Sequence, residues 1–379
     1  MRKKGIWVVV ISLMVVGLVL GVFGCARETA PPTSTPSPTA SPTPTPTIQP
    51  VTLKLATVVP PPESSMHGEL VKAWQDMVTE RTGGKVTFTT YHNCALGKPA
   101  EHLTLVEKRT VDIVFTSGLY TPTETALQDY EYVFPFGPTD PHIIGQAKRQ
   151  MFEEFPILKE ELAKHNIAII AQVPTCTFSF TSREPIKTLA DFEGKKCAVI
   201  GRWFGQWVGA VGAVPVTLPG QERYTALQTG VIDTSFNPID WQYQFKDIEV
   251  APYVLDPGIF ISNTMSFWIN QDTLNSLPKE VQDILFQAGK DVEKLAADEV
   301  QPKWQKKVWE EWERNSNYQY YKLSEEEKAK WVANCPDTPA VWAAEMEQQG
   351  YPGWDIVKRY QELCAERGFT WLREWGVKQ

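Results

Sequence analysis

The sequence lacks the short motifs that identify common hydrolases and nucleotide-binding enzymes. It contains no Gly-x-Ser-x-Gly, no His-Glu-x-x-His and no Gly-x-x-x-x-Gly-Lys. Its five histidines stand at no spacing typical of metal ligands, and no Cys-x-x-Cys occurs. We therefore expect no metal site and no cofactor, and we expect a protein that binds a ligand and is not an enzyme.

Positive charge is also scarce. The 379 residues include 37 Lys and Arg against 45 Asp and Glu, which gives a formal net charge of −8. A surface that binds nucleic acid has to be basic, so nucleic acid is not expected as a partner. A chain of 379 residues is long enough for two domains with substantial cores. Its 42% hydrophobic and 22% charged residues are typical of a globular protein.

The sequence has few cysteines, and their number does not establish whether a disulfide forms. Six cysteines occur, and five remain once Cys25 is set aside. A single disulfide, for example Cys335–Cys364, and buried free thiols both remain open from the sequence.

The first 24 residues have the pattern of a signal peptide. Three basic residues at 2–4 precede an uncharged apolar run, and the segment 22–25 (Val-Phe-Gly-Cys) resembles a bacterial lipobox, in which Cys25 becomes the lipidated first residue. The alternative is an uncleaved membrane anchor. Residues 25–50 are mostly Thr, Ser, Pro and Ala, which predicts an extended tether. We expect an extracytoplasmic protein, lipid-anchored to the membrane.

From residue 51 onward, predicted strands and helices alternate. Period-two alternation predicts a strand over 51–57, helical spacing predicts a helix that stops at Thr82, and further strands are predicted at 86–91 and 111–115. Residues 182–237 form a second βαβαβ unit of the same order. Parallel strands joined by helices leave a crevice at their carboxyl ends, where a small ligand can bind. We predict two similar α/β lobes and not one sheet.

The remaining elements connect these two units. We predict helices within 142–165, strands at 167–172 and 178–181, and a returning strand at 264–270. A capping-box pattern starts a helix at Ser324, and residues 350–353 separate two C-terminal helices. The C-terminal tryptophans are expected in the core and not in a ligand cage; they are Trp331, Trp342, Trp354, Trp371 and Trp375.

Four phrases in the second unit carry a family resemblance. They lie at 189–196 (Leu-Ala-Asp-Phe-Glu-Gly-Lys-Lys), 212–216 (Gly-Ala-Val-Pro-Val), 224–233 (Tyr-Thr-Ala-Leu-Gln-Thr-Gly-Val-Ile-Asp) and 237–238 (Asn-Pro). They resemble the solute receptors of TRAP transporters, the tripartite ATP-independent periplasmic carriers. Within that family, the resemblance is to the dicarboxylate receptors. Similar phrases at 76–85, 95–97 and 111–113 extend the resemblance over roughly 51–285.

The resemblance implies a two-lobed periplasmic-binding-protein-like α/β fold with crossing strands and a long bracing helix that starts near residue 278. Lobe I would comprise 51–174, completed by about 264–300, and lobe II 175–263, completed by about 301–379. Such a protein, expected to be a monomer, would bind a small organic solute between its lobes and deliver it to the TRAP permease subunits. The alternatives are a receptor of the same fold that presents its solute to a sensor kinase, and an extracytoplasmic enzyme.

The sequence departs from the family where a carboxylate-binding arginine is expected. Ala198 stands at the arginine of the family's Lys-x-Arg phrase, and a second family arginine falls near Thr177. Asn237, which the family uses as a ligand donor, is retained. Arg202 is our candidate for a displaced positive charge, with a surface arginine as the alternative.

Aromatic residues surround this departure. The set consists of Trp203, Phe204, Trp207, Phe236, Trp241 and Tyr243. We predict that Trp203 and Trp241 line the cleft, with ordinary core packing as the alternative, and we add Thr116 to the ligand-binding candidates. The ligand is then not a simple C4 dicarboxylate. A bulkier organic acid and an uncharged or cationic solute both fit an aromatic wall.

Overall fold

The structure is a computed structural model that describes residues 48–258 and 264–378. The chain divides into two units, 1–47 and 48–379, and the second contains every helix and strand given below. The expected signal peptide at 1–24, the lipidation site Cys25 and nearly all of the tether at 25–50 lie outside the described residues.

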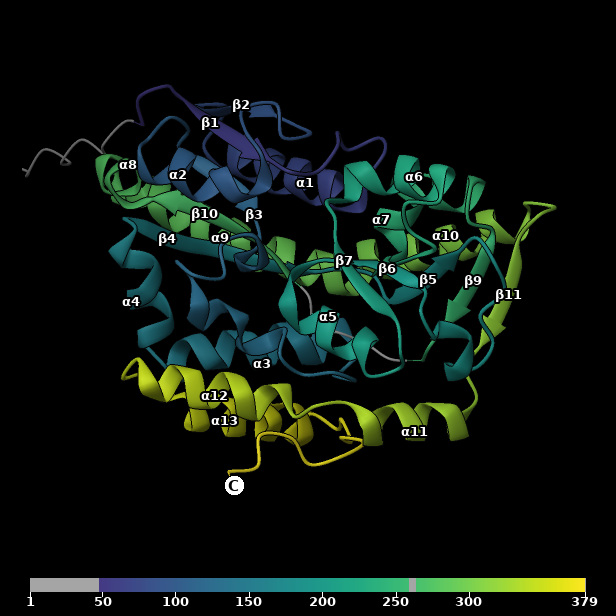
Figure 1. The fold of residues 1–379 in the computed structure, drawn as a ribbon. Helices are drawn as coiled ribbons and strands as arrows, with labels where there is room; N and C mark the ends of the chain where they lie inside the picture. The colour runs from purple at the N-terminus through teal and green to yellow at the C-terminus, as the bar shows by residue number, and fades with distance from the viewer. Residues whose placement is uncertain (1–47, 259–263, 379) are drawn as a thin grey trace, which may run out of the picture. The chain divides into compact units, whose positions relative to one another are not determined.

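The first sheet has five strands in the order β2-β1-β3-β10-β4 (Figure 1). β1 pairs in parallel with β2 and β3, and β10 runs antiparallel between β3 and β4. The strands are β1 (Val51–Thr57), β2 (Val86–Tyr91), β3 (Ile113–Thr116), β4 (Ile167–Pro174) and β10 (Thr264–Asn270). The associated helices are α1 (Met66–Arg81), α2 (His102–Glu107), α3 (Pro141–Glu154), α4 (Ile157–Lys164) and α8 (Gln271–Ser276).

The second sheet has six strands in the order β11-β9-β5-β8-β6-β7. β6 pairs in parallel with β7 and β8, whereas β5 is antiparallel to β8 and β9. The strands are β5 (Phe178–Ser182), β6 (Lys196–Val199), β7 (Val214–Thr217), β8 (Thr234–Pro238), β9 (Tyr253–Asp256) and β11 (Gln319–Lys322). The helices are α5 (Gly201–Gly209), α6 (Gly220–Thr229) and α7 (Ile239–Gln244). Two sheets confirm the prediction of a two-lobed α/β fold.

The chain crosses between the sheets three times: from β4 to β5, from β9 to β10, and, through residues 271–318, from β10 to β11. β4 ends at Pro174 in the first sheet, and β5 begins at Phe178 in the second. The return runs from Asp256, the end of β9, to Thr264, the start of β10, through a segment in which residues 259–263 lie outside the described part. These are the crossing strands that the resemblance implies.

A long helix braces both sheets. α9 (Lys279–Leu295) continues through a π-helical turn (Ala296–Val300) into α10 (Gln301–Glu313). α9 packs on β4 and α1, and α10 packs on α7. The approach of α9 to β4 is so close that a Cβ on Gly289 would lie 2.7 Å from the Ile170 carbonyl oxygen.

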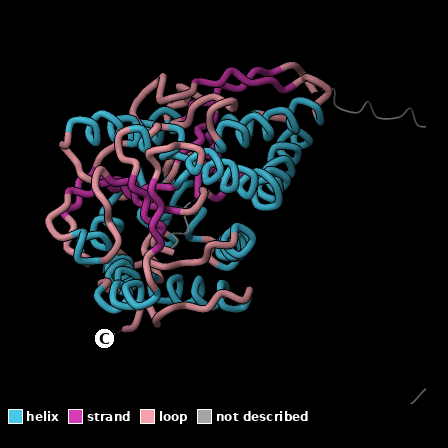
Figure 2. Tube along the Cα trace, turned by 90° about the vertical axis from the view of Figure 1, so that its right-hand side faces the viewer, coloured by secondary structure: helices cyan, strands magenta, loops and turns pink. Residues whose placement is uncertain are grey.

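Three helices end the chain: α11 (Glu325–Asn334), α12 (Thr338–Gln348) and α13 (Gly353–Glu366). They lie together along the lower edge of Figure 1, and Figure 2 shows the C-terminus beside this layer. The Ser324 hydroxyl accepts the Glu327 N–H at 3.2 Å, which confirms the predicted helix start. Trp331, Trp342 and Trp375 are fully buried, so their predicted core role is confirmed.

The cysteines from Cys94 onward are free thiols, and four of the five are buried. Free thiols, one of the two possibilities left open by the sequence, are therefore what the structure contains. No helix within 48–258 and 264–378 combines the length and the apolar character that a bilayer span requires.

Candidate functional site

Among the described residues with buried side-chain nitrogen or oxygen atoms that have no hydrogen-bond partner, six lie at the ends of β3 and β8, on the helices α1, α6 and α7, or on the 3-10 helix Asp247–Glu249. We call them the buried polar cluster. Its members and free atoms are His67 Nε2, Thr116 Oγ1, Arg223 Nη2, Asn237 Nδ2 and Oδ1, Trp241 Nε1, and both carboxylate oxygens of Asp247. Most buried polar groups in proteins are hydrogen-bonded, so this cluster has binding capacity that its own fold does not use.

His67 joins the two lobes within this cluster. It lies in the first turn of α1, where the Ser65 hydroxyl caps the helix by accepting the Gly68 N–H at 2.9 Å. Its ring centroid is 5.9 Å from that of Phe115 in β3 and 6.2 Å from that of Trp241 in α7. The end of β3 in the first lobe and helix α7, which follows β8 in the second lobe, therefore meet at the His67 ring.

Asn237 lies near the end of β8, and its neighbours explain how that strand end is held. It pairs in register with Ser179 of β5. The Gln242 amide on α7 donates to the carbonyl oxygens of Ser179 at 2.8 Å and Ser235 at 3.0 Å, which fixes α7 on the strands. The Asn237 side chain is 1% exposed and is not used in this bracing.

Arg223 is the cluster member that the sequence prediction missed. It lies on α6, on the same buried side as Ala226 and Leu227, three and four residues later. Its Nε donates to the Leu218 carbonyl oxygen at 3.1 Å. A charged residue on the apolar side of a predicted helix is the signal that could have found it, because arginine is rarely fully buried.

The structure brings three of the six predicted ligand-binding residues into the cluster, namely Thr116, Asn237 and Trp241. The other three have partners elsewhere. The Gln305 amide oxygen accepts the backbone N–H of Thr177 at 3.0 Å, and the Gln305 amide nitrogen donates to the Thr177 hydroxyl at 2.6 Å. Arg202 is half exposed, forms an ion pair with Glu345 on α12 and stacks on Trp203 at 3.9 Å. Trp203 is 1% exposed.

Trp203 also donates its indole N–H to Asp129, at 3.1 Å from Oδ2. Asp129 is in the 3-10 helix Ala126–Glu131, and burial raises the pKa of its carboxyl from 3.8 to about 7, although the Trp203 hydrogen bond opposes the rise. Between these two values the folded protein binds a proton that the unfolded chain releases. The contribution of Asp129 to folding stability therefore falls as the pH rises from about 4 to about 7.

The Asp129→Asn variant tests this pH dependence. The asparagine amide carries no charge and keeps an oxygen that can accept the Trp203 N–H. Between pH 5 and pH 8, the free energy of unfolding of the variant should therefore fall by about 1–2 kcal/mol less than that of the unmodified protein. Urea unfolding of both proteins at the two pH values measures the difference. Parallel stability curves for the variant and the unmodified protein would contradict the raised pKa.

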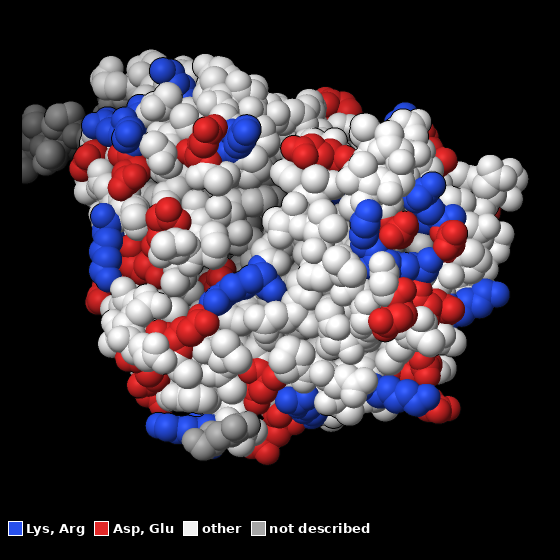
Figure 3. Space-filling view, viewed as in Figure 1, with Lys and Arg blue, Asp and Glu red and all other residues white. Residues whose placement is uncertain are grey.

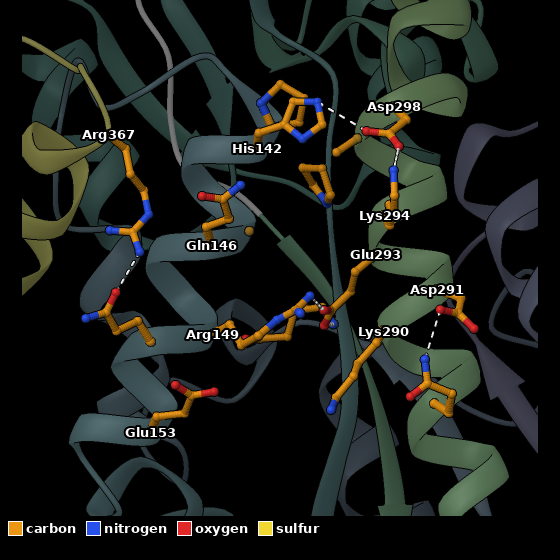
Figure 4. Close-up of a pocket in the computed structure, with 17 residues that line it drawn as sticks. His142, Gln146, Arg149, Glu153, Lys290, Asp291, Glu293, Lys294, Asp298 and Arg367 are labelled. Carbon is orange, nitrogen blue, oxygen red and sulfur yellow. Dashed lines mark hydrogen bonds and ion pairs between the residues drawn. The ribbon is translucent and has the colours of Figure 1, made fainter.

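A separate cavity of about 760 Å³ lies between α3, α9 and the π-helical turn (Figure 4). Its charged walls are largely paired with one another. Arg149 contacts Glu293 at 2.5 Å, and Asp298 is paired with Lys294 and with His142, the latter at 3.4 Å. Within 48–258 and 264–378, no group of three or more His, Cys, Asp or Glu side chains is arranged to hold a metal ion.

The surface in Figure 3 is hollowed between elements of lobe I at upper left and elements of lobe II at the right. Charges of both signs are mixed around its rim, and the area drawn over α5 and β7 is mostly uncharged. The surface on this side of the molecule therefore has no strong electrostatic field of a single sign.

Comparison with known proteins gives a family match over most of the chain. Residues 55–344 match the family described as "Bacterial extracellular solute-binding protein, family 7". The ectoine-binding periplasmic protein TeaA of Halomonas elongata is 33% identical over 136 residues, which cover 35% of this chain and 38% of that protein.

Solved structures have the same fold. A TRAP solute-binding protein of Rhodoferax ferrireducens, in complex with copurified benzoate, aligns with a TM-score of 0.75 and 23% identity, over 83% of this chain and 98% of that one. A marine metagenome TRAP solute-binding protein, described as specific for aromatic acid ligands and bound to 3-hydroxybenzoate, aligns with a TM-score of 0.75 and 23% identity, over 85% and 100%.

Proposed function

Because this chain belongs to family 7 of the bacterial extracellular solute-binding proteins, the extracytoplasmic receptors of TRAP transporters, we propose that it binds its solute at the buried polar cluster and delivers it to a TRAP membrane permease. The observation that carries the proposal is the cluster itself. Residues of both lobes contribute buried polar atoms that have no partner. A solute bound there would hydrogen-bond to both lobes and hold them together.

The ligand we propose is a small organic acid with an apolar or aromatic part, and not a simple C4 dicarboxylate. Two aromatic rings, those of Phe115 and Trp241, lie beside His67 and supply apolar surface next to the polar atoms. Ala198 stands where the resemblance places a carboxylate-binding arginine. The benzoate and 3-hydroxybenzoate complexes of similar structures support the same class.

We also propose the arrangement around the folded part. Lobe I comprises 51–174 completed by 264–300, and lobe II comprises 175–263 completed by 301–379, a division supported by the strand membership of the two sheets. A lipid on Cys25 and a tether over 25–50 hold a monomeric receptor at the membrane surface, within reach of the permease.

Native mass spectrometry of the purified protein tests the receptor role. We expect one small molecule of a few hundred daltons or less per chain, which is released on denaturation. After dialysis, a thermal-shift panel of aromatic acids, pyroglutamate, succinate, neutral amides and amines should raise the melting temperature only with monocarboxylates. A protein that carries no small molecule and responds to no compound of the panel would contradict the receptor role.

A further inference from the structure

Arg223 is a fully buried guanidinium that the protein satisfies only in part. Its Nη1 donates to the Ser235 hydroxyl at 3.0 Å and to the Phe236 carbonyl oxygen at 2.9 Å, whereas Nη2 has no partner. A guanidinium stays protonated in proteins, so the positive charge persists at 0% exposure. A buried charge of this kind is strongly unfavourable unless an anion compensates it.

The protein supplies only partial compensation. Asp247 is the acid that attracts Arg223 most strongly, yet the hydrogen bonds of the guanidinium go to Leu218, Ser235 and Phe236 and not to the Asp247 carboxylate. Burial raises the pKa of Asp247 to about 7, with Arg223 opposing the rise, so near neutral pH this carboxyl is protonated in part of the molecules. The positive charge of Arg223 is therefore cancelled only in part from within the fold.

The guanidinium lies at the side of the sheet where Asn237 also lies. Ser235, which Arg223 contacts, is the register partner of Ala198 in β6. Alternate residues of a strand share one face, so Ser235 and Asn237 point to the same side of β8. The free Nη2 and the free amide of Asn237 thus belong to one face of the second sheet.

Tyr120 brings the first lobe to this face. It follows β3 by four residues, and burial raises the pKa of its phenol; the nearby Cys94 adds to the rise and Arg223 opposes it. A second contact crosses the same boundary, since the Gln221 amide on α6 approaches Cys94 Sγ to 3.8 Å. Arg223 therefore lies where α6 meets the loops that follow β2 and β3.

Arg223 is the permanently charged cation of the buried polar cluster, and one such cation matches a ligand with one anionic group. Among the described residues, Lys148 and Arg223 are the buried lysine and arginine side chains, and Lys148 is paired with Glu131. Asn237 offers both a donor and an acceptor, and its acceptor requires a hydroxyl or N–H group on the ligand. One cation and one amide match a monocarboxylic acid that carries a hydrogen-bond donor.

We propose, on the basis of the receptor role above, that Arg223 binds the carboxylate of such a monocarboxylic acid through Nη2, while Asn237 bonds the ligand's second polar group. The positive charge of the site then comes from helix α6 and not from strand β6. Arg202, which contacts Glu345 at the surface, has no part in it.

Calorimetric titration of the dialysed protein with 3-hydroxybenzoate, L-pyroglutamate, succinate and 3-hydroxybenzamide tests the proposal. The unmodified protein should bind 3-hydroxybenzoate or pyroglutamate, and 3-hydroxybenzamide should bind at least about 100-fold more weakly than 3-hydroxybenzoate, because it lacks the charge that pairs with a buried guanidinium. Arg223→Met should lose about 100-fold in affinity for the acid that binds, Arg223→Lys should lose less, and the control Arg202→Met should change affinity less than about threefold.

Each contrary result has its own meaning. Equal affinity for acid and amide overturns the proposal in the unmodified protein, whether or not Arg223→Met folds. A folded Arg223→Met variant, verified by an unchanged far-ultraviolet spectrum, that binds the acid normally also overturns it while the receptor role stands. Binding of succinate alone overturns the monocarboxylate class. An absence of any ligand in these titrations and in native mass spectrometry overturns the receptor role together with the proposal.

Discussion

Replacing Lys148 by methionine is expected to lower the free energy of unfolding by about 3–5 kcal/mol, because the change leaves a buried carboxylate without its cation. Lys148 of α3 lies 2.5 Å from Glu131 Oε1, and both side chains are almost fully buried. Lys148 also hydrogen-bonds the hydroxyl of Thr264, where the chain re-enters the first sheet as β10. The pair therefore connects α3, the 3-10 helix before it and a crossing strand.

Urea unfolding measures this effect, and two further variants separate its causes. The double variant Glu131→Gln/Lys148→Met removes both charges and should recover most of the loss. Lys72→Met breaks an ion pair with Asp76 in which both side chains are more than half exposed, and it should cost less than about 1 kcal/mol. A Lys148→Met protein as stable as Lys72→Met would show that the buried pair contributes little.

The Asn237→Ala variant should weaken ligand binding by about 10- to 100-fold while leaving the ligand-free protein as stable as before, or up to about 1 kcal/mol more stable. Both amide atoms of Asn237 are buried without partners, so the ligand-free fold loses no hydrogen bond with them. Calorimetry with the acid that binds best gives the affinity, and urea unfolding of the dialysed protein gives the stability.

Asn270 is the matched control, since it is the last residue of β10, as Asn237 is the last but one of β8, and both are buried. Its amide is fully used: Oδ1 accepts the backbone N–H groups of Asp272 and Thr273, and Nδ2 donates to the Val106 carbonyl oxygen at 3.0 Å. Asn270→Ala should therefore lose about 1–2 kcal/mol of stability and keep its affinity. If Asn237→Ala instead behaved like this control, the assignment of Asn237 to the site would be wrong.

Local patterns predicted most elements of the fold. The alternation over 51–57 and the apolar run over 264–270 correspond to β1 and β10 with the same limits. β9 and β11 were missed, because each has four residues and is defined by pairing with strands more than sixty positions away in the chain, β9 with β5 and β11, and β11 with β9. Such pairing is a property of the tertiary structure and leaves no periodic signal in a short segment.

The candidate site was less predictable, for a reason that Arg202 and Arg223 illustrate. Both follow the family's arginine position in the sequence, and Arg202 is the nearer to Ala198. The structure pairs Arg202 with Glu345, a residue 143 positions away that no local pattern connects to it. Arg223 is turned inward because the apolar side of α6 faces the sheet, and only the helix orientation decides which of the two charges becomes buried.

The interleaving of the two sheets has a consequence for how such a protein can be divided or recombined. In the first sheet, β10 lies between β3 and β4, although in the chain it comes after five of the six strands of the second sheet. The edge strand of the second sheet, β11, comes later still in the chain. If the gene were cut between β9 and β10, the first product would lack β10 of the first sheet and β11 of the second. The second product would contain both of these strands. Neither lobe can therefore be exchanged between relatives as one uninterrupted piece of coding sequence.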